Sequence, residues 1–173
     1  MCKLSDVVFD EEVIIVDDSK TPVNDFYLSK FKYKLIYIHR GERLGVSSAR
    51  NVGAKKSTRD YLLFFDDDDE FTIDWLNDFR KSIKNFPDIV FCDMKLIFPS
   101  GRIEIVFAEK LENGIVIPGS WLIYRKIFEK TNGYDERMNF GENTELFFRF
   151  NLQRLKINYI NKVNFIYYQS IDG

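Results

Sequence analysis

The stretch Asp60-Tyr61-Leu62-Leu63-Phe64-Phe65-Asp66-Asp67-Asp68-Asp69 is an apolar run that ends at four consecutive aspartates. This length and composition predict a buried strand over Tyr61–Phe65, with the carboxylates at its carboxyl end. Adjacent carboxylates repel one another unless solvent or a cation neutralises them. Because ligands of open α/β sheets bind beyond the carboxyl ends of strands, we expect a ligand site at the tip of this strand.

A second acidic strand end lies upstream. Val13–Val16 is a β-branched run that stops at Asp17-Asp18-Ser19, which predicts another buried strand. Leu35–Ile38 predicts a further strand, and Gly45-Val46-Ser47-Ser48 predicts a helix start capped by a serine. Strands that alternate with helices favour an α/β fold with a Rossmann-like, mostly parallel sheet flanked by helices.

The second half of the chain adds antiparallel character, so we expect a mixed sheet. Thr72 opens a helix with Ile73, Leu76, Phe79 and Ile83 along one face, and Ile89–Cys92 is a buried strand. The other expected elements are a hairpin over Met94–Phe107 that turns at Pro99–Arg102, helices over Arg125–Thr131 and Thr144–Leu155, and a strand region over Ile157–Tyr168 with a turn at Asn161-Lys162.

Length and composition indicate one globular domain over residues 1–173, with 45% hydrophobic and 30% charged residues. A net charge of −2 gives no support for a nucleic-acid binder. We expect Cys2 and Cys92 to be reduced thiols. With no apolar stretch long enough for a membrane span and no signal segment, a cytoplasmic location is expected, with peripheral contact at the inner face of a membrane left open.

The acidic run has several chemical interpretations. An Asp-x-Asp pair such as Asp66 and Asp68 can bridge a hard cation, Mg²⁺ or Mn²⁺, to a diphosphate. The same run also suits a calcium site, or an ordinary loop that stabilises the following helix through its dipole. A phosphatase or nucleotidyltransferase would need an early Asp nucleophile or a phosphate-binding Gly/Lys loop, and we find neither.

Three stretches, in order and in register, are similar to those of the inverting family 2 glycosyltransferases of the GT-A fold. They cover residues 13 to about 155. They are Val13–Ser19, which resembles the family's strand ending in Val-Asp-Asp; Gly45–Gly53 with Asp60–Asp69, which resembles its Gly-x-Ser-x-Ala-Arg-Asn-x-Gly helix and Asp-x-Asp strand; and Gly119–Arg125, Asn132–Glu136 and Gly141–Leu146, which resemble its acceptor-side segment ending in Glu-Asp.

This resemblance implies roles for matching residues. The donor nucleotide sugar would be bound by Asp17 or Asp18 at the nucleoside, by Arg50 at the base, and by Asp66, Asp67 and Asp68 at the ribose and diphosphate. The metal, Mn²⁺ or Mg²⁺, would be held by Asp68 together with Asp66. The acceptor and donor-sugar side would be lined by Gly119, Ser120 and Trp121. The alternatives are a helix-surface ion pair for Arg50 and a core aromatic for Trp121.

The chain departs from the family pattern at three places. The family places a strand and a helix before its Val-Asp-Asp strand, so the resemblance implies an N-terminally truncated fold whose sheet lacks one parallel strand. The family's catalytic base, the Asp of Glu-Asp, is Asn143 here, and an amide has no useful basicity. Many relatives also have a late histidine in the metal site, whereas this region reads Tyr167-Tyr168-Gln169 and the one histidine, His39, suits a strand end.

Glu142 or Glu145 can replace Asn143 as the base. The choice depends on which side chain faces the pocket, because successive residues of a helix point about 100° apart. Glu142, expected just before the helix, is the favoured candidate. Its alternative role is a charge at the helix N-terminus.

The resemblance therefore implies an enzyme that transfers a sugar, with inversion, from a nucleoside-diphosphate sugar, UDP-linked, to a saccharide or lipid-linked acceptor. The implied pathway is bacterial surface polysaccharide assembly. The alternative is a non-catalytic, truncated or degenerate glycosyltransferase-like domain, which the implied loss of a strand and Asn143 both favour.

Overall fold

Strands and helices alternate through the first half of the chain, in a computed structural model that describes residues 11–31, 35–113, 116–138, 140–150 and 154–169. The strands are β1 (Val13–Asp17), β2 (Leu35–His39), β3 (Tyr61–Leu63), β4 (Glu70–Phe71), β5 (Ile89–Ile97), β6 (Ile103–Val106), β7 (Trp121–Tyr124) and β8 (Ile157–Tyr168). The α-helices are α1 (Asp25–Leu28), α2 (Val46–Lys56), α3 (Trp75–Ser82), α4 (Arg125–Lys130) and α5 (Glu142–Arg149), and two 3-10 segments are η2 (Ile83–Asn85) and η3 (Ala108–Asn113). None of the described helices has the length and apolar character needed to cross a membrane.

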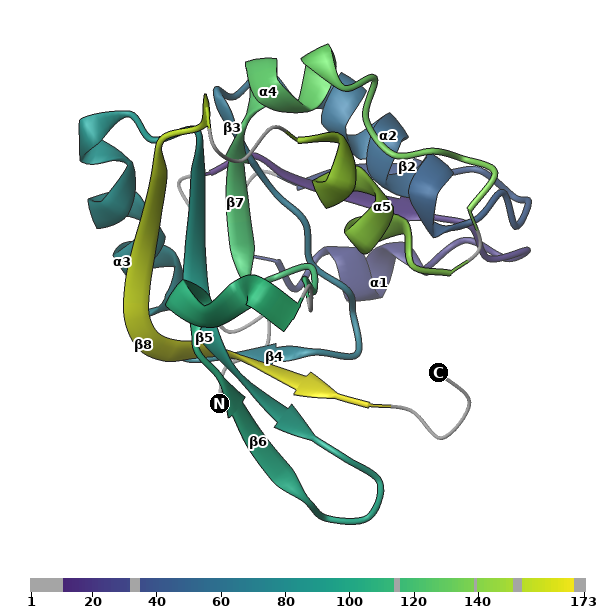
Figure 1. Ribbon diagram of the computed structural model, residues 1–173. Coiled ribbons are helices and arrows are strands. Elements are labelled where there is room, and N and C mark those ends of the chain that lie inside the picture. The colour runs from purple at the N-terminus through teal and green to yellow at the C-terminus, as the bar shows by residue number, and fades with distance from the viewer. Residues whose placement is uncertain (1–10, 32–34, 114–115, 139, 151–153, 170–173) are drawn as a thin grey trace.

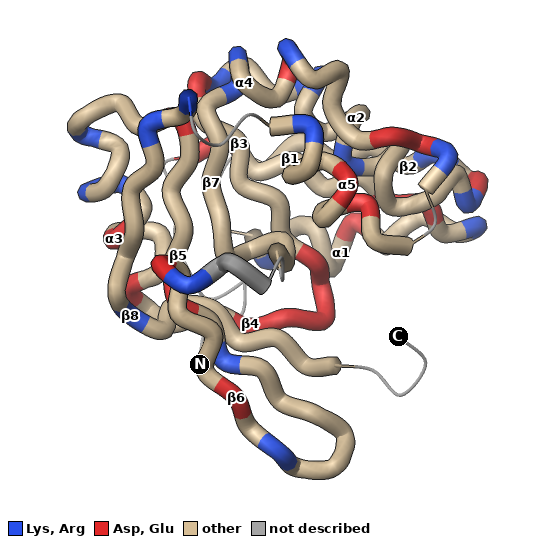
Figure 2. Tube along the Cα trace, in the orientation of Figure 1, with Lys and Arg blue, Asp and Glu red and all other residues tan. Residues whose placement is uncertain are grey.

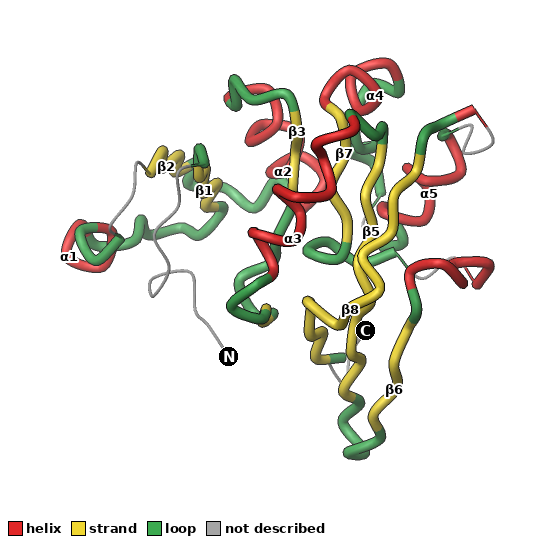
Figure 3. The backbone as a smooth tube through the Cα atoms, turned by 90° about the vertical axis from the view of Figure 1, so that its left-hand side faces the viewer, coloured by secondary structure: helices red, strands yellow, loops and turns green. Residues whose placement is uncertain are grey.

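The strands form two separate sheets (Figures 1 and 3). β1 and β2 pair in parallel, and the larger sheet has the order β3-β7-β5-β8-β4 with β6 alongside β5. In the larger sheet β5 and β8 run parallel, whereas the pairs β3–β7, β5–β7, β5–β6 and β4–β8 are antiparallel. The α/β class and the mixed sheet are confirmed. The expectation of a mostly parallel sheet is wrong, because the chain returns through hairpin-like connections in its second half.

The break between the sheets falls between β1 and β3. Within the described ranges, β1 pairs with β2 and β3 pairs with β7, and no strand joins β1 to β3. Helix α2 connects the two parts, since Gly53 lies against Val16 of β1 while Ala54 lies in the core with Leu62 of β3.

Helices cover both faces of the larger sheet because its strands alternate between two apolar cores. On β5, Ile89 and Phe91 face one core, and Val90 and Cys92 face the other. Helices α2, α4 and α5 pack against the first core and α3 against the second, which gives three layers (Figure 1). Cys92 is buried with a free thiol, as predicted, and Cys2 lies outside the described residues.

The hairpin over β5 and β6 is confirmed, with Ile97 opposite Ile103, but the turn predicted at Asn161-Lys162 is wrong. β8 runs on through these two residues, and its pairing with β5 jumps from Ile160 to Val163. The extra residues form a β-bulge, which bends a strand without reversing it. The polar residues Asn161 and Lys162 therefore lie at a bend within β8 and not at a turn between two strands.

Two helix starts also differ from expectation. α2 begins at Val46 after Gly45, which has a φ of 87°, and no side chain caps its first turn, so the predicted serine cap is wrong. α3 begins at Trp75, and Ile73 is exposed before it. The Thr72 backbone and hydroxyl bond instead to Asn164 of β8, which delays the helix.

Candidate active site

The four aspartates lie beyond the carboxyl end of β3 and lead into β4, where Figure 2 shows a continuous acidic segment. Their environments differ. Asp67 and Asp68 are exposed, the Asp66 side chain is 33% exposed, and Asp69 is 8% exposed. The run thus combines solvent-accessible carboxylates with one buried carboxylate, that of Asp69.

Asp69 is a buried carboxylate without a hydrogen-bond partner on either oxygen among the described residues. Burial and the charges of Asp66 and Asp68 raise its pKa to about 8, and the Tyr168 backbone and Arg50 offset only part of this. Such an unpaired group is costly unless something else satisfies it.

The pairing of β4 with β8 explains where Asp69 points. Glu70 lies opposite Ile166 and Phe71 opposite Phe165, so continuing the register by one residue sets Asp69 beside Tyr167 on the core-facing side. Burial, followed by the charges of Asp69 and its acidic neighbours, raises the pKa of Tyr167. Tyr167 therefore borders the acidic run.

Arg50 of α2 joins the acidic run to the start of α5. Its Nη2 donates to both oxygens of Asp66, at 2.8 and 2.9 Å, and its Nη1 donates to Oε1 of Glu142 at 2.7 Å. The arginine side chain is 8% exposed and Glu142 12%. Burial alone lowers the pKa of Arg50, but the charges of Asp66 and Tyr134 and the hydrogen bonds that Arg50 donates to Asp66 and Glu142 together raise it above its usual value. The guanidinium is thus a fixed cation between two carboxylates.

Tyr134 packs against the Arg50 side chain of this cluster. The Arg50 guanidinium carbon lies 5.3 Å from the centre of the Tyr134 ring, in cation–π geometry. Asn51, the next residue of α2, uses its amide to accept a bond from the Tyr134 backbone N–H and donate one to its C=O, both 2.9 Å. Gly133 must be glycine here, because a Cβ would lie 2.5 Å from the Asn51 amide oxygen and φ is +68°.

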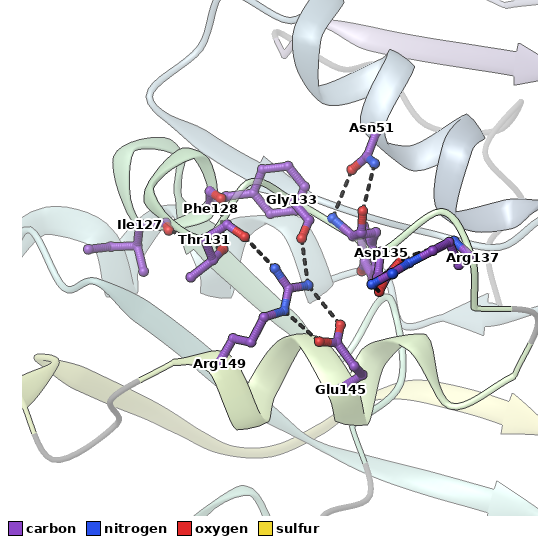
Figure 4. Close-up of polar contacts among 10 residues, drawn as sticks. Asn51, Ile127, Phe128, Thr131, Gly133, Asp135, Arg137, Glu145 and Arg149 are labelled. Atoms are coloured by element: carbon purple, nitrogen blue, oxygen red, sulfur yellow. Dashed lines mark hydrogen bonds and ion pairs between the residues drawn. The ribbon is translucent and has the colours of Figure 1, made fainter.

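The two candidate bases lie in different surroundings. Glu142, the first residue of α5, contacts Arg50 and so belongs to the acidic cluster. Glu145 instead makes two bonds to Arg149, at 2.7 and 2.8 Å. Figure 4 shows the Arg149 guanidinium held by the backbone carbonyls of Thr131 and Gly133, so Glu145 serves the turn after α4. Of the two, the geometry favours Glu142.

Asn143, at the position of the family's base, also faces the cluster. Its Oδ1 accepts a bond from the Tyr134 hydroxyl at 3.0 Å, and its Nδ2 donates to Oε1 of Glu142 at 2.9 Å. It is thus part of the same hydrogen-bonded network.

The acidic end of β1 is connected to this cluster through α2. Asp18 forms a partly buried ion pair with Arg40, which in turn donates to the Ser48 hydroxyl of α2 at 2.8 Å. Hydrogen bonds from Ser19 and Tyr37 lower the pKa of Asp17 to about 2. His39 ends β2 and lies 2.8 Å from the Ser19 carbonyl, as expected for a strand-end residue.

The segment expected on the acceptor side is mostly buried. Gly119 lies over Phe165, and its carbonyl accepts a bond from the Trp75 indole at 2.8 Å. Ser120 is buried and donates to the Ile117 carbonyl. Trp121 is fully buried and packs edge-on against Phe147, so the prediction that its side chain lines an acceptor site is wrong and the core alternative holds. Its place in β7, between β3 and β5, explains this burial.

The sequence model of glycosyl transferase family 2 matches residues 8–168 of the chain. The chain belongs to this family. The match covers the acidic run, α2 and the start of α5, so it includes the whole cluster described above. The order of motifs predicted this family, and the match confirms it.

Solved family-related structures share the fold. The first 349 residues of TarS from S. aureus align with a TM-score of 0.76 and 20% identity, covering 90% of this chain and 50% of that one. GalNAc-T7, solved with UDP, GalNAc and Mn²⁺, aligns with a TM-score of 0.67 and 15% identity, covering 94% and 38%. These likenesses confirm the GT-A-like fold.

A curated relative, the probable N-acetylgalactosaminyltransferase 7 of Caenorhabditis elegans, is 34% identical over 79 residues. The alignment covers 43% of this chain and 13% of that protein. The chain thus spans a small part of this relative and about half of the TarS chain.

Sequence reasoning assigned no role to four residues that the structure places in or beside the cluster, namely Asn51, Asp69, Tyr134 and Tyr167. Asn51 and Tyr134 stood inside the quoted motifs, so their presence there was a usable signal. The burial of Asp69 had no such signal, because four identical neighbours do not show which one turns inward.

Proposed function

We propose that this chain carries the active site of an enzyme that transfers a sugar, with inversion, from a UDP-linked donor to a hydroxyl of a saccharide or lipid-linked acceptor. The observation that carries the proposal is Arg50, which holds Asp66 at one end and Glu142 at the other. A diphosphate at the acidic run and a hydroxyl at Glu142 would therefore lie side by side. TarS has been solved with UDP-GlcNAc, which supports a nucleotide-sugar donor.

The acidic run fits a hard divalent cation, Mn²⁺ or Mg²⁺. Both oxygens of Asp69 lack a partner, and Asp68 is open to solvent. In the part of the chain that the structure describes, no three His, Cys, Asp or Glu side chains gather into a metal site. Diphosphate oxygens and water would therefore complete the coordination, as is usual for Mg²⁺ and substrate phosphates. The cation, when bound, neutralises charge that grows on the departing diphosphate.

Glu142 would act as the general base. It takes the proton from the acceptor hydroxyl while the acceptor oxygen forms its bond to the anomeric carbon. The bond from that carbon to the diphosphate oxygen breaks, and the nucleoside diphosphate leaves with the electron pair. Attack from the side opposite the leaving group inverts the anomeric configuration.

Calorimetry with UDP, UDP-GlcNAc and UDP-GalNAc, with and without Mn²⁺, tests this function. We expect Mn²⁺-dependent binding that Asp68→Ala weakens at least about tenfold, or about 1.4 kcal/mol. Asp60→Ala, an exposed carboxylate just before β3, is the matched control and should bind as the wild type does. Glu142→Gln should keep donor binding and lose release of UDP, and unchanged release would exclude Glu142 as the base.

The second candidate is a non-catalytic domain. The separation of the β1–β2 sheet from β3 favours it, because the nucleoside side and the acidic run then belong to different sheets. This candidate predicts that a folded sample binds none of the three nucleotides. Fluorescence of the buried Trp75 and Trp121 verifies folding in the same sample.

A further inference from the structure

The two oxygens of Glu142 are not equivalent. Oε1 accepts two hydrogen bonds, from Arg50 Nη1 at 2.7 Å and from Asn143 Nδ2 at 2.9 Å. Within the described ranges, no hydrogen bond to Oε2 is formed. Two donors on one oxygen fix the carboxylate plane and leave the other oxygen as an unused acceptor.

The Asn143 amide can make its bond to Glu142 because Tyr134 fixes its orientation. An ionised carboxylate only accepts, so Nδ2, which carries the hydrogens, must face Glu142, and Oδ1 then accepts the bond from the Tyr134 hydroxyl at 3.0 Å, which holds the amide in place. An aspartate at 143 has no hydrogens to offer and would place a second negative charge beside Glu142. The residue that removes the family's usual base therefore also serves Glu142.

Tyr134 is itself a rigid anchor. The residue is buried, its backbone N–H and C=O are both bonded to the Asn51 amide, and its ring packs against Phe64 and Phe128. Its backbone and ring are thus held from α2 and from the core, and its hydroxyl is left to bond to Asn143.

We infer that Asn143 and Tyr134 are positioning residues for Glu142 in the reaction proposed above, and that the base of this chain stands one residue before its usual place. This inference rests on the proposed function. Tyr134 orients Asn143, and Asn143 and Arg50 hold Oε1, which leaves Oε2 for the proton of the acceptor hydroxyl. In this arrangement Asn143 holds the Glu142 carboxylate through the hydrogen bond from its Nδ2.

The experiment measures release of UDP from UDP-GlcNAc with Mn²⁺, water being the acceptor, together with the Kd of UDP. We expect Asn143→Ala and Asn143→Asp to lower kcat at least about tenfold, while the Kd of UDP changes less than about twofold. Tyr134→Phe, which keeps the packed ring, should lower kcat about three- to tenfold. Tyr61→Phe and Asn158→Ala are matched controls, because each removes one side-chain hydrogen bond outside the cluster.

The aspartate variant is the decisive one. If Asn143→Asp is as active as the wild type or more active, position 143 accepts the proton better than Glu142 and the inference is overturned. A Kd that rises in step with the loss of kcat would indicate a general structural role and overturn it as well. Failure of the wild type to bind UDP removes the proposed function itself, whereas UDP binding without release of UDP overturns the inference and leaves nucleotide binding standing.

Discussion

Replacing the buried Asp69 by asparagine should stabilise the protein at high pH. The unfolded carboxyl loses its proton near its ordinary pKa of 3.8, but the folded one near a pKa of about 8. Between these values the folded state binds one more proton than the unfolded state, so the free energy of unfolding falls as the pH rises. Asparagine has no such proton, and its stability escapes this loss.

The magnitude follows from the same shift. One pH unit corresponds to about 1.4 kcal/mol, so the contribution of Asp69 can change by at most about 4 kcal/mol between pH 5 and pH 8. Water that enters the loop lowers the cost of a buried charge, so we expect about 2 kcal/mol. The free energy of unfolding of Asp69→Asn relative to the wild type should therefore rise by this amount from pH 5 to pH 8.

Urea unfolding in EDTA, followed through the buried Trp75 and Trp121, measures this difference at several pH values. Asp60→Asn, which replaces an exposed carboxylate just before β3, is the control and should shift stability equally little at every pH. A constant difference between Asp69→Asn and the wild type from pH 5 to pH 8 would refute the reasoning, since it would mean that Asp69 titrates alike in both states.

Two further predictions concern the frame of the site. Arg50→Met removes the ion pairs of both Asp66 and Glu142 and should cost about 3 kcal/mol in urea unfolding. Arg40→Met, which removes only the ion pair of Asp18, should cost about 1–2 kcal/mol, and equal losses would contradict the bridging role of Arg50. Gly119→Ala should cost about 3 kcal/mol or more in thermal unfolding, because φ is +89° and the new Cβ would lie 2.2 Å from the Phe165 ring. Gly101→Ala, with φ +81° and open space, should cost about 1 kcal/mol, and a similar loss in both variants would show that the ring contact is harmless.

The sequence predicted strands wherever an apolar run had clear ends. Val13–Val16 stops at two aspartates and Tyr61–Phe65 at four, and strands lie at both places, although β1 runs one residue further, to Asp17, and β3 ends two residues earlier, at Leu63. Pairing directions were harder, because β5 and β8 are parallel neighbours separated by most of the second half of the chain. Periodicity shows which residues are buried, but it does not show which distant strand lies alongside.

The site residues could be predicted where they belong to a sequence motif, and could not be predicted where their role depends on which side chains the fold buries. Arg50 and Glu142 were named from motif positions, but their direct contact depends on how α2 and α5 pack over β3. Trp121 was misplaced for the opposite reason. A large aromatic two residues after a glycine suits a ligand site and a core equally well, and the position of β7 between β3 and β5 decided for the core.

Helix α2, more than the sheet, is the frame of this site. Ser48 accepts a bond from Arg40, the partner of Asp18, while Arg50 holds Asp66 and Asn51 holds the backbone of Tyr134. Three residues within four positions of one helix point in different directions because each step turns about 100°. Each therefore fixes a different part of the chain, and together they connect the two sheets that hydrogen bonding leaves separate. The relation between the acidic end of β1 and the acidic run thus depends on side chains of α2. Under the proposed function, loss of these side chains should disturb donor binding more than loss of any single strand contact.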